Sequence, residues 1–224
     1  MLSSKLVFTP SYYTTRLHKH LGSPLSTENT SSYRRLIGRL IYLTNTKPDI
    51  TYVVQHLNQF VVEPISAHQQ AASIILRYIK GSLGVGIFLS TNNNIHLKGF
   101  SDSYWVDCLD TKRSITGYAI YICNSLISWK SKKQTTVSRS SWETEYRALT
   151  SATCELQWLT FLLEEFKVHF QHPATLYCNN KFALHIVVNL VFHERTKHIE
   201  INCYIVQEKV MTRLVKLLII SFAN

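Results

Sequence analysis

Two acidic residues stand where this sequence could build a metal-dependent active site. Asp102 comes just after the apolar run 95–100, and a carboxylate at the end of a buried strand is well placed to hold a hard cation. Glu145 lies inside the expected helix 142–166, and at about 100° per residue it falls in the middle of the apolar stripe. That stripe consists of Leu149, Ala152, Leu156, Leu159 and Leu163.

The position of Glu145 in that stripe favours a function. An ionised carboxylate on a core-facing stripe is costly unless a cation, a hydrogen-bond donor or a metal lies beside it. If the helix packs on the sheet, Glu145 faces the strand end that carries Asp102. Glu143 is predicted to point the opposite way, toward solvent and within reach of Arg147. A helix-dipole or capping role for Glu145 is the structural alternative.

A sheet and a strand–helix unit must position these acids. The apolar runs 85–89 and 95–100 are separated by the turn-forming segment 90–94, which predicts a hairpin. Two more antiparallel strands, then a parallel strand with its helix, are expected at 114–123, 126–133, 174–179 and 181–188. The segment 198–211 is expected to form the last helix.

Three short helices are expected before the sheet. Tyr33 begins a run of apolar residues at helical spacing behind Ser32, the expected cap. Pro48 ends this helix and suits the first turn of a second. A third helix extends from about Ser66 to Gly81. The first helix carries basic residues on its other faces, at Arg34, Arg35 and Arg39. These helices could serve packing, nucleic-acid contact or both.

The charge balance favours a polyanionic partner. The chain has 24 Lys and Arg against 14 Asp and Glu, a formal charge of +10, although a solvated basic surface would give the same count. Lys130 and Lys132 alternate to one side of a strand beside Trp129, and Lys133 follows, so these lysines could track a phosphate backbone. Lysines that protect a sheet edge from aggregation are the structural alternative.

Composition bounds the fold and the location. With 224 residues, 46% of them hydrophobic, the chain can bury a sizeable core. The chain has five cysteines, an odd number, and no two of them are spaced as C-x-x-C. The cysteines therefore suggest neither a zinc ribbon nor a framework of disulfide bonds. No secretory signal and no apolar run long enough to span a bilayer is present in the sequence. We therefore expect a cytoplasmic or nuclear protein that is not secreted and has no membrane partner.

An ordered series of motifs resembles the C-terminal end of a Ty1/copia-type retrotransposon Pol polyprotein. The motifs include Tyr33-Arg-Arg-Leu-Ile-Gly-Arg-Leu, Lys47-Pro-Asp-Ile, Gly99-Phe-Ser-Asp102, Ile127-Ser-Trp-Lys-Ser-Lys-Lys-Gln134, Ser140-Ser-Trp-Glu-Thr-Glu-Tyr-Arg and His193-Glu-Arg-Thr-Lys-His-Ile-Glu200. The resemblance implies an α/β fold, a ribonuclease H-like mixed five-stranded sheet with flanking helices, preceded by a small helical region. Residues 1–90 would be a connection remnant of the reverse transcriptase, and residues 91–224 a ribonuclease H-like domain truncated at its C-terminus. No polymerase activity is expected, because the paired-aspartate motif of the polymerase is absent.

The resemblance also implies a site. Ribonucleases H of this kind cleave the RNA strand of an RNA–DNA hybrid with two Mg²⁺ ions held by carboxylates. Asp102 and Glu145 match two of these acids and would be metal ligands. Asn179 stands at the third position, where the family has an aspartate. Glu200 matches a fourth position, and Asn202 is a possible second aspartate position that is replaced by asparagine.

The two asparagines predict a weakened enzyme. Replacing a carboxylate by an amide removes a unit charge, worth about 4 kcal/mol at a separation of about 4 Å and an effective dielectric near 20. Mg²⁺ binding should therefore be weak, and cleavage of hybrids very weak or absent. Two alternatives remain: a module that binds hybrid or double-stranded nucleic acid without cutting it, and a translated relic with no cellular role. The rest of the Pol polyprotein is the other partner that the resemblance implies.

Overall fold

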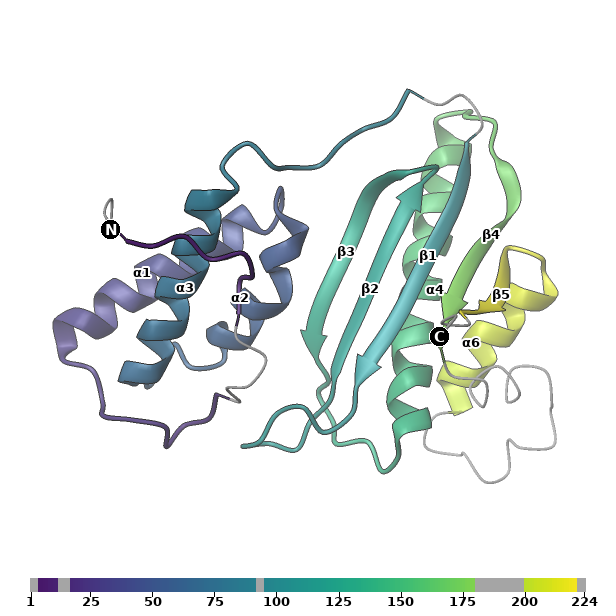
Figure 1. Cartoon of the computed structure of the whole chain (residues 1–224). Helices are drawn as coiled ribbons and strands as arrows, with labels where there is room; N and C mark the ends of the chain where they lie inside the picture. The colour runs from purple at the N-terminus through teal and green to yellow at the C-terminus, as the bar shows by residue number, and fades with distance from the viewer. Residues whose placement is uncertain (1–3, 12–16, 92–94, 180–199, 221–224) are drawn as a thin grey trace. The chain divides into compact units, whose positions relative to one another are not determined.

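The computed structural model describes residues 4–11, 17–91, 95–179 and 200–220. The chain divides into two compact units, Met1–Ile87 with Cys108–Thr111, and Phe88–Asp107 with Lys112–Asn224 (Figure 1). The first unit is helical and the second contains the sheet. None of the helices in these described ranges is long and apolar enough to cross a membrane.

The helical unit contains the three expected helices, α1 (Thr27–Leu43), α2 (Thr51–Asn58) and α3 (Ser66–Gly81), with the short 3₁₀ turn Pro48–Ile50 before α2. The predicted cap of α1 is wrong. Ser26 caps the helix, since its side chain accepts a hydrogen bond from the Asn29 N–H. Several serines and threonines precede Tyr33, so the sequence offered more than one possible cap, and the helix begins at the first of them that satisfies a free N–H.

The core of the helical unit is formed where the apolar faces of these helices meet. Its buried members include Tyr33, Ile37, Leu40, Val54, Leu57 and Ile75. The Tyr33 hydroxyl donates to the Leu57 carbonyl oxygen at 2.9 Å, which satisfies the one polar group that this side chain takes into the core.

The sheet has five strands in the order β3-β2-β1-β4-β5. Their bounds are His96–Tyr104 for β1, Ile115–Ile122 for β2, Ser125–Lys133 for β3, Gln171–Cys178 for β4 and Val215–Ile219 for β5. The strands β1, β2 and β3 pair antiparallel, whereas β1 pairs with β4, and β4 with β5, in parallel. The predicted mixed five-stranded α/β sheet is confirmed.

One of the five predicted strands is wrong. Residues 85–89 form no strand, and β5 is the fifth strand instead. The reason lies in the pairing of β1, because β2 occupies one of its edges and β4 the other, which leaves no edge for a hairpin partner. The Val85 carbonyl oxygen accepts a hydrogen bond from the Lys47 ammonium at 2.6 Å.

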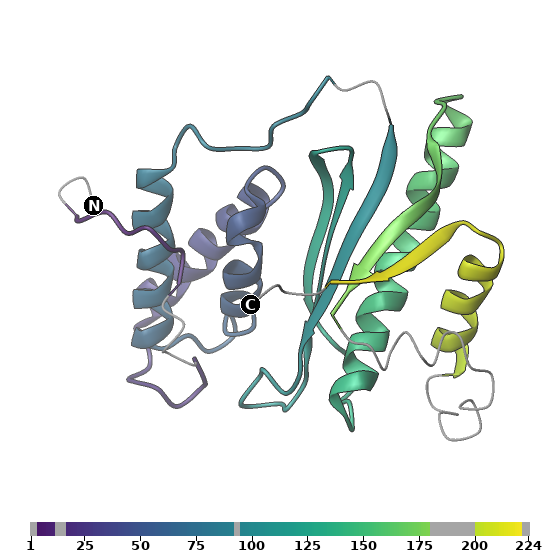
Figure 2. The same cartoon turned by 45° about the vertical axis from the view of Figure 1, so that its right-hand side comes forward.

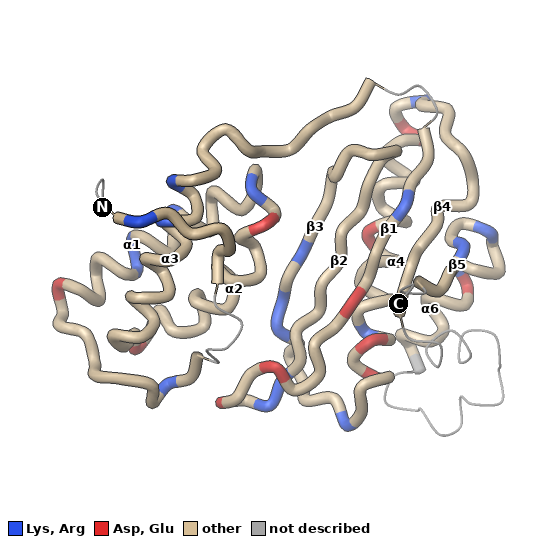
Figure 3. The backbone as a smooth tube through the Cα atoms, viewed as in Figure 1, with Lys and Arg blue, Asp and Glu red and all other residues tan. Residues whose placement is uncertain are grey.

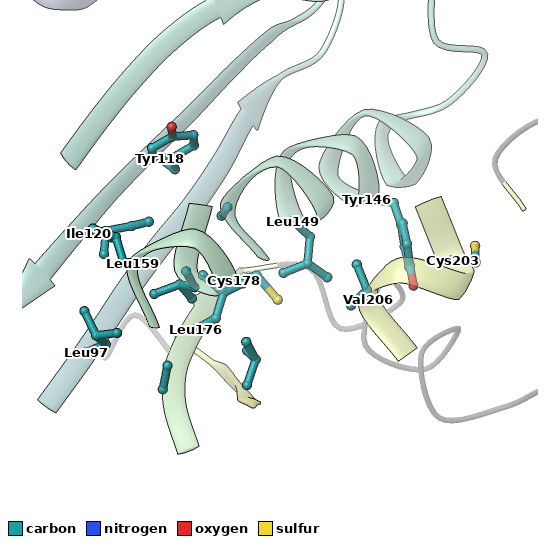
Figure 4. Packing of buried hydrophobic residues seen from close by; sticks show 14 residues of the cluster. Leu97, Tyr118, Ile120, Tyr146, Leu149, Leu159, Leu176, Cys178, Cys203 and Val206 are labelled. Carbon is teal, nitrogen blue, oxygen red and sulfur yellow. The ribbon is translucent and has the colours of Figure 1, made fainter. Parts of the chain in front are cut away.

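Two helices, α4 (Ser141–Glu165) and α6 (Glu200–Met211), lie on one face of the sheet (Figure 2). The buried cluster between them and the strands includes Leu97, Ile120, Leu149, Leu156, Leu176 and Val206 (Figure 4). Gly99 lets α4 approach β1 closely, since a Cβ there would lie 3.0 Å from Leu176 and 3.5 Å from Leu156. This packing fixes α4 over the strand that carries Asp102. The last predicted helix is confirmed by α6, while the predicted helix 181–188 lies outside the described residues.

Candidate active site

Asp102 and Asn179 meet at neighbouring strand ends. Asp102 is an exposed residue near the end of β1, and the parallel register pairs Phe100 with Tyr177 on β4. Two residues beyond that pair, Asn179 therefore comes beside Asp102. The Asn179 Nδ2 donates to the Asp102 Oδ1 at 3.2 Å, and the same oxygen accepts from the Ser103 N–H at 2.8 Å. An amide thus fills the place where the resemblance implies a third acid.

Glu145 completes the group from the first turns of α4. It is half-buried, and its Oε2 atom has no hydrogen-bond partner in the part of the chain that the structure describes. Burial, and then the charge of Asp102, raise the pKa of Glu145 from its ordinary value of 4.5 to about 7, while hydrogen bonding from Ser103 offsets part of the rise. The structure therefore brings Asp102, Glu145 and Asn179 together, with one carboxylate close to half-protonated at neutral pH.

The raised pKa of Glu145 predicts that stability falls as pH rises. A carboxyl with a higher pKa in the folded chain binds more protons when folded, so the folded state loses stability between about pH 4.5 and about pH 7 and little changes above that range. Urea unfolding of the unsubstituted chain and of Glu145→Gln at pH 5 and pH 8 measures this. The difference in stability between the two proteins should shift in favour of the Gln variant at pH 8. A difference that is the same at both pH values would contradict the prediction.

The prediction for Glu143 is wrong. This residue was predicted to face solvent, but it is only 1% exposed. Its Oε1 accepts from the Arg147 guanidinium at 2.8 Å, as the spacing of the two residues predicted, and its Oε2 accepts from the Arg139 N–H at 2.8 Å. The loop before α4 folds back over the helix start and covers Glu143, which a helical wheel cannot show. Glu143 is therefore a structural acid.

A buried network that the sequence did not indicate holds the same region. Gln134 is 8% exposed, and its Nε2 donates to the Thr116 Oγ1 at 3.0 Å and to the Thr144 carbonyl oxygen at 3.2 Å. Its Oε1 accepts from the Ser138 hydroxyl at 2.9 Å. Gln134 thus ties β2 and the loop after β3 to the residue that precedes Glu145. Only the position of a glutamine at the end of a strand could have suggested this.

The remaining predicted site residues lie in α6. Glu200 is its first residue and Asn202 lies in its first turn. The side chain of Glu200 is outside what the structure describes. The roles of Glu200 and Asn202 as fourth acid and degenerate acid therefore stay predictions.

The oxygen atoms of the assembled group are of the kind that a hard divalent cation prefers. Asp102 and Glu145 offer two carboxylates, and the buried Glu145 Oε2 has no partner within the described residues. An amide carbonyl from Asn179 could add a neutral ligand. Over the described ranges, no group of three or more Asp, Glu, His or Cys side chains is placed to hold a metal ion. Asp102 and Glu145 are therefore the described residues that could hold a hard divalent cation such as Mg²⁺.

The predicted nucleic-acid-binding residues fall into two sets. Basic residues follow one another along β3 (Figure 3), where Lys130 and Lys132 are exposed and Lys133 is half-buried on the other side of the strand. The Lys130 ammonium lies 5.8 Å from the centroid of the Tyr118 ring. In the helical unit the exposed arginines are Arg34, Arg35 and Arg39.

The guanidinium of Arg34 has a structural role. Its Nε and Nη2 atoms donate to the Val61 and Val62 carbonyl oxygens at 2.7 and 2.8 Å. These bonds satisfy backbone carbonyls after α2. Arg34 is therefore a weaker candidate for a phosphate contact than the exposed lysines of β3.

Comparison with known proteins places the chain in a family. It is 37% identical over 221 residues to the retrovirus-related Pol polyprotein from transposon RE2 of Arabidopsis thaliana, and 38% identical over 221 residues to that from transposon RE1 of the same plant. Each match covers 99% of this chain. The chain belongs to the copia-type retrotransposon Pol family. This copia-type Pol segment spans 15% of the length of each of these relatives.

Comparisons with protein-family models and with solved structures gave the following results. No protein-family model matches this copia-type Pol segment. Among solved structures it is similar to the LC11-RNase H1 isolated from compost, with a TM-score of 0.42 and 13% sequence identity over 58% of this chain and 85% of that one. The sheet of the chain, an antiparallel meander extended by two parallel strands, has the mixed five-stranded arrangement that the family resemblance implied.

Proposed function

We propose that this chain is a hybrid-binding, ribonuclease H-like domain whose cleavage of the RNA strand is very weak or absent. The observation that supports the proposal is the hydrogen bond from the Asn179 amide to Asp102 at 3.2 Å. A donor group occupies the place beside Asp102 where a third carboxylate would draw in a cation. The pKa of Glu145 is raised to about 7, so a proton competes with a metal ion for this carboxylate at neutral pH, which weakens metal binding further.

Magnesium, when bound by Asp102 and Glu145, would supply Lewis-acid stabilisation of charge on a phosphate. The residues of this chain would position that ion. Asp102 is held in place by the Ser103 N–H, and Glu145 must lose its proton before it can act as a ligand. Because the pKa of Glu145 is raised to about 7, much of this carboxyl group carries a proton at neutral pH, and a proton and a cation then compete for the same oxygen atoms. Cation binding should therefore strengthen from pH 6 to pH 8.

The test is a cleavage assay on a labelled RNA–DNA hybrid with Mg²⁺ or Mn²⁺, run beside a binding assay at low salt. We expect salt-dependent binding with little or no hydrolysis. Robust Mg²⁺-dependent hydrolysis that disappears in Glu145→Gln would show that the site is intact and would contradict the impairment. An absence of binding at low salt would dismiss the nucleic-acid-binding function itself.

A binding module without catalysis is the second candidate, and the exposed lysines on one side of β3 favour it. Replacing both Lys130 and Lys132 by Ala should weaken hybrid binding and reduce the slope of log affinity against log salt by about 2, because each phosphate contact contributes about 0.9. Fluorescence anisotropy at several salt concentrations measures this slope. The charge-matched control is Lys167→Ala with Lys216→Ala, two exposed lysines elsewhere on the same unit. Equal losses in both double variants would assign the effect to net charge alone.

A further inference from the structure

Trp105 is an exposed aromatic side chain that the protein nevertheless holds in place. It is 51% exposed and comes three residues after Asp102, within a chain reach of about 10 Å. Its indole Nε1 donates to the Ser138 carbonyl oxygen at 3.3 Å. The polar edge of the ring is thereby fixed to the protein while much of its apolar surface stays in water.

The acceptor of that hydrogen bond is itself held by the buried network around Gln134. The Ser138 residue is 3% exposed, and its hydroxyl donates to the Gln134 Oε1 at 2.9 Å. Gln134 in turn binds the carbonyl oxygen of Thr144, the residue before Glu145. One continuous chain of hydrogen bonds therefore connects the Trp105 ring to the helix turn that carries Glu145.

The backbone next to Trp105 is held in an uncommon conformation. Val106 has a φ of 54°, in the left-handed region that a β-branched residue rarely adopts. Its N–H donates to the hydroxyl of the buried Ser114 at 3.2 Å. Surrounding structure thus maintains a strained turn directly after Trp105, and such strain is found most often at functional sites.

From these contacts we propose that Trp105 is a nucleic-acid-contacting residue, which packs its ring face against a sugar of the hybrid strand that passes Asp102. An aromatic face is apolar and accepts any nucleotide, so it suits a sequence-independent contact. Pre-ordering the ring by the Ser138 hydrogen bond lowers the entropy lost when the strand binds. The inference rests on the proposed hybrid binding and adds to it a specific contact beside the acids.

The test measures binding alone, so it does not depend on catalysis. A fluorescein-labelled RNA–DNA hybrid of about 18 base pairs is titrated with the full chain at low salt without divalent metal, and Kd is obtained by anisotropy. Trp105→Ala should raise Kd by about 5- to 100-fold, the range expected when one well-packed aromatic side chain is removed from an interface. Trp105→Phe keeps an aromatic ring but not the hydrogen bond to Ser138, so its Kd should lie between those of the unsubstituted chain and Trp105→Ala. Because no phosphate contact is lost, the salt slope should not change.

The matched control is Trp158→Ala. Trp158 lies on α4 with a comparable exposure of 56%, and its loss should leave Kd within about twofold. The inference is overturned if Trp105→Ala binds as tightly as the unsubstituted chain, or if Trp158→Ala weakens binding equally. If the unsubstituted chain fails to bind at low salt, both this inference and the proposed function are wrong. If it binds and only the Trp105 effect is missing, the proposed function stands and this inference alone fails.

Discussion

Asn179→Asp is expected to raise Mg²⁺-dependent cleavage of the RNA strand by about 100- to 1000-fold over the unsubstituted chain. The substitution replaces a donor that faces Asp102 at 3.2 Å by a third carboxylate. A unit charge at ligand distance is worth about 4 kcal/mol at an effective dielectric near 20, and about 1.4 kcal/mol corresponds to a tenfold change in rate. Initial rates on a labelled hybrid, measured as a function of Mg²⁺ concentration, give both the activity and the apparent metal affinity.

Two further variants separate the restored site from a general effect of charge. Asn124→Asp adds the same charge in the exposed turn between β2 and β3, at the opposite end of the strands from Asp102, and should restore nothing. Asn179→Asp combined with Glu145→Gln should lose the gain. If Asn179→Asp alone is inactive, the double variant Asn179→Asp with Asn202→Asp tests whether residue 202 is a second site position where an acid has been replaced by asparagine. Equal activation by Asn124→Asp would contradict a local role for residue 179.

Glu143→Ala is expected to lower the free energy of unfolding by about 2–4 kcal/mol, whereas Glu145→Ala should not lower it, because burial of the Glu145 carboxylate already costs stability at neutral pH. Removing Glu143 takes the acceptor from the part-buried Arg139 N–H and one of the acceptors from the Arg147 guanidinium, which keeps its bond to the Thr136 hydroxyl. Removing Glu145 takes away a carboxylate whose Oε2 has no partner among the described residues. Two acids only two residues apart in α4 would thus be shown to have different roles, one structural and one in the candidate site.

Urea unfolding at pH 7, followed by tryptophan fluorescence, measures this contrast. All four tryptophans, Trp105, Trp129, Trp142 and Trp158, belong to the unit that contains the sheet, so the signal reports on that unit. Glu143→Gln is the matched variant, because it keeps the shape and one acceptor and should cost less than Glu143→Ala. Similar losses for the alanine variants of Glu143 and Glu145 would show that Glu145 is also a structural acid, and would weaken its assignment to the site.

Local patterns predicted the elements of the sheet unit well. The meander, the long helix and the phase of Glu145 on it follow from periodicity, which depends only on residues near in sequence. Periodicity gave wrong predictions where contacts with a segment distant in sequence, or with a preceding loop, determine the structure. Residues 85–89 have the composition of a strand, but both edges of β1 are already paired. Glu143 has the phase of a surface residue, but the loop that precedes α4 covers it.

The sequence by itself determined which residue types are present at the candidate site. It showed two acids, an asparagine at the position that the family resemblance gives to an aspartate, and a basic chain suited to a polyanion. Their identities need no structure, because charge and hydrogen-bonding capacity belong to the side chains themselves.

Only the tertiary structure decided which of these groups meet. Asp102 and Asn179 are 77 residues apart, and the parallel register of β1 and β4 brings them together. The link from Trp105 through Ser138 and Gln134 to the start of α4 arises in the same way, from segments with no shared periodicity. Long-range pairing depends on the packing of the whole core, so a sequence pattern could supply the parts of the site but not their contacts.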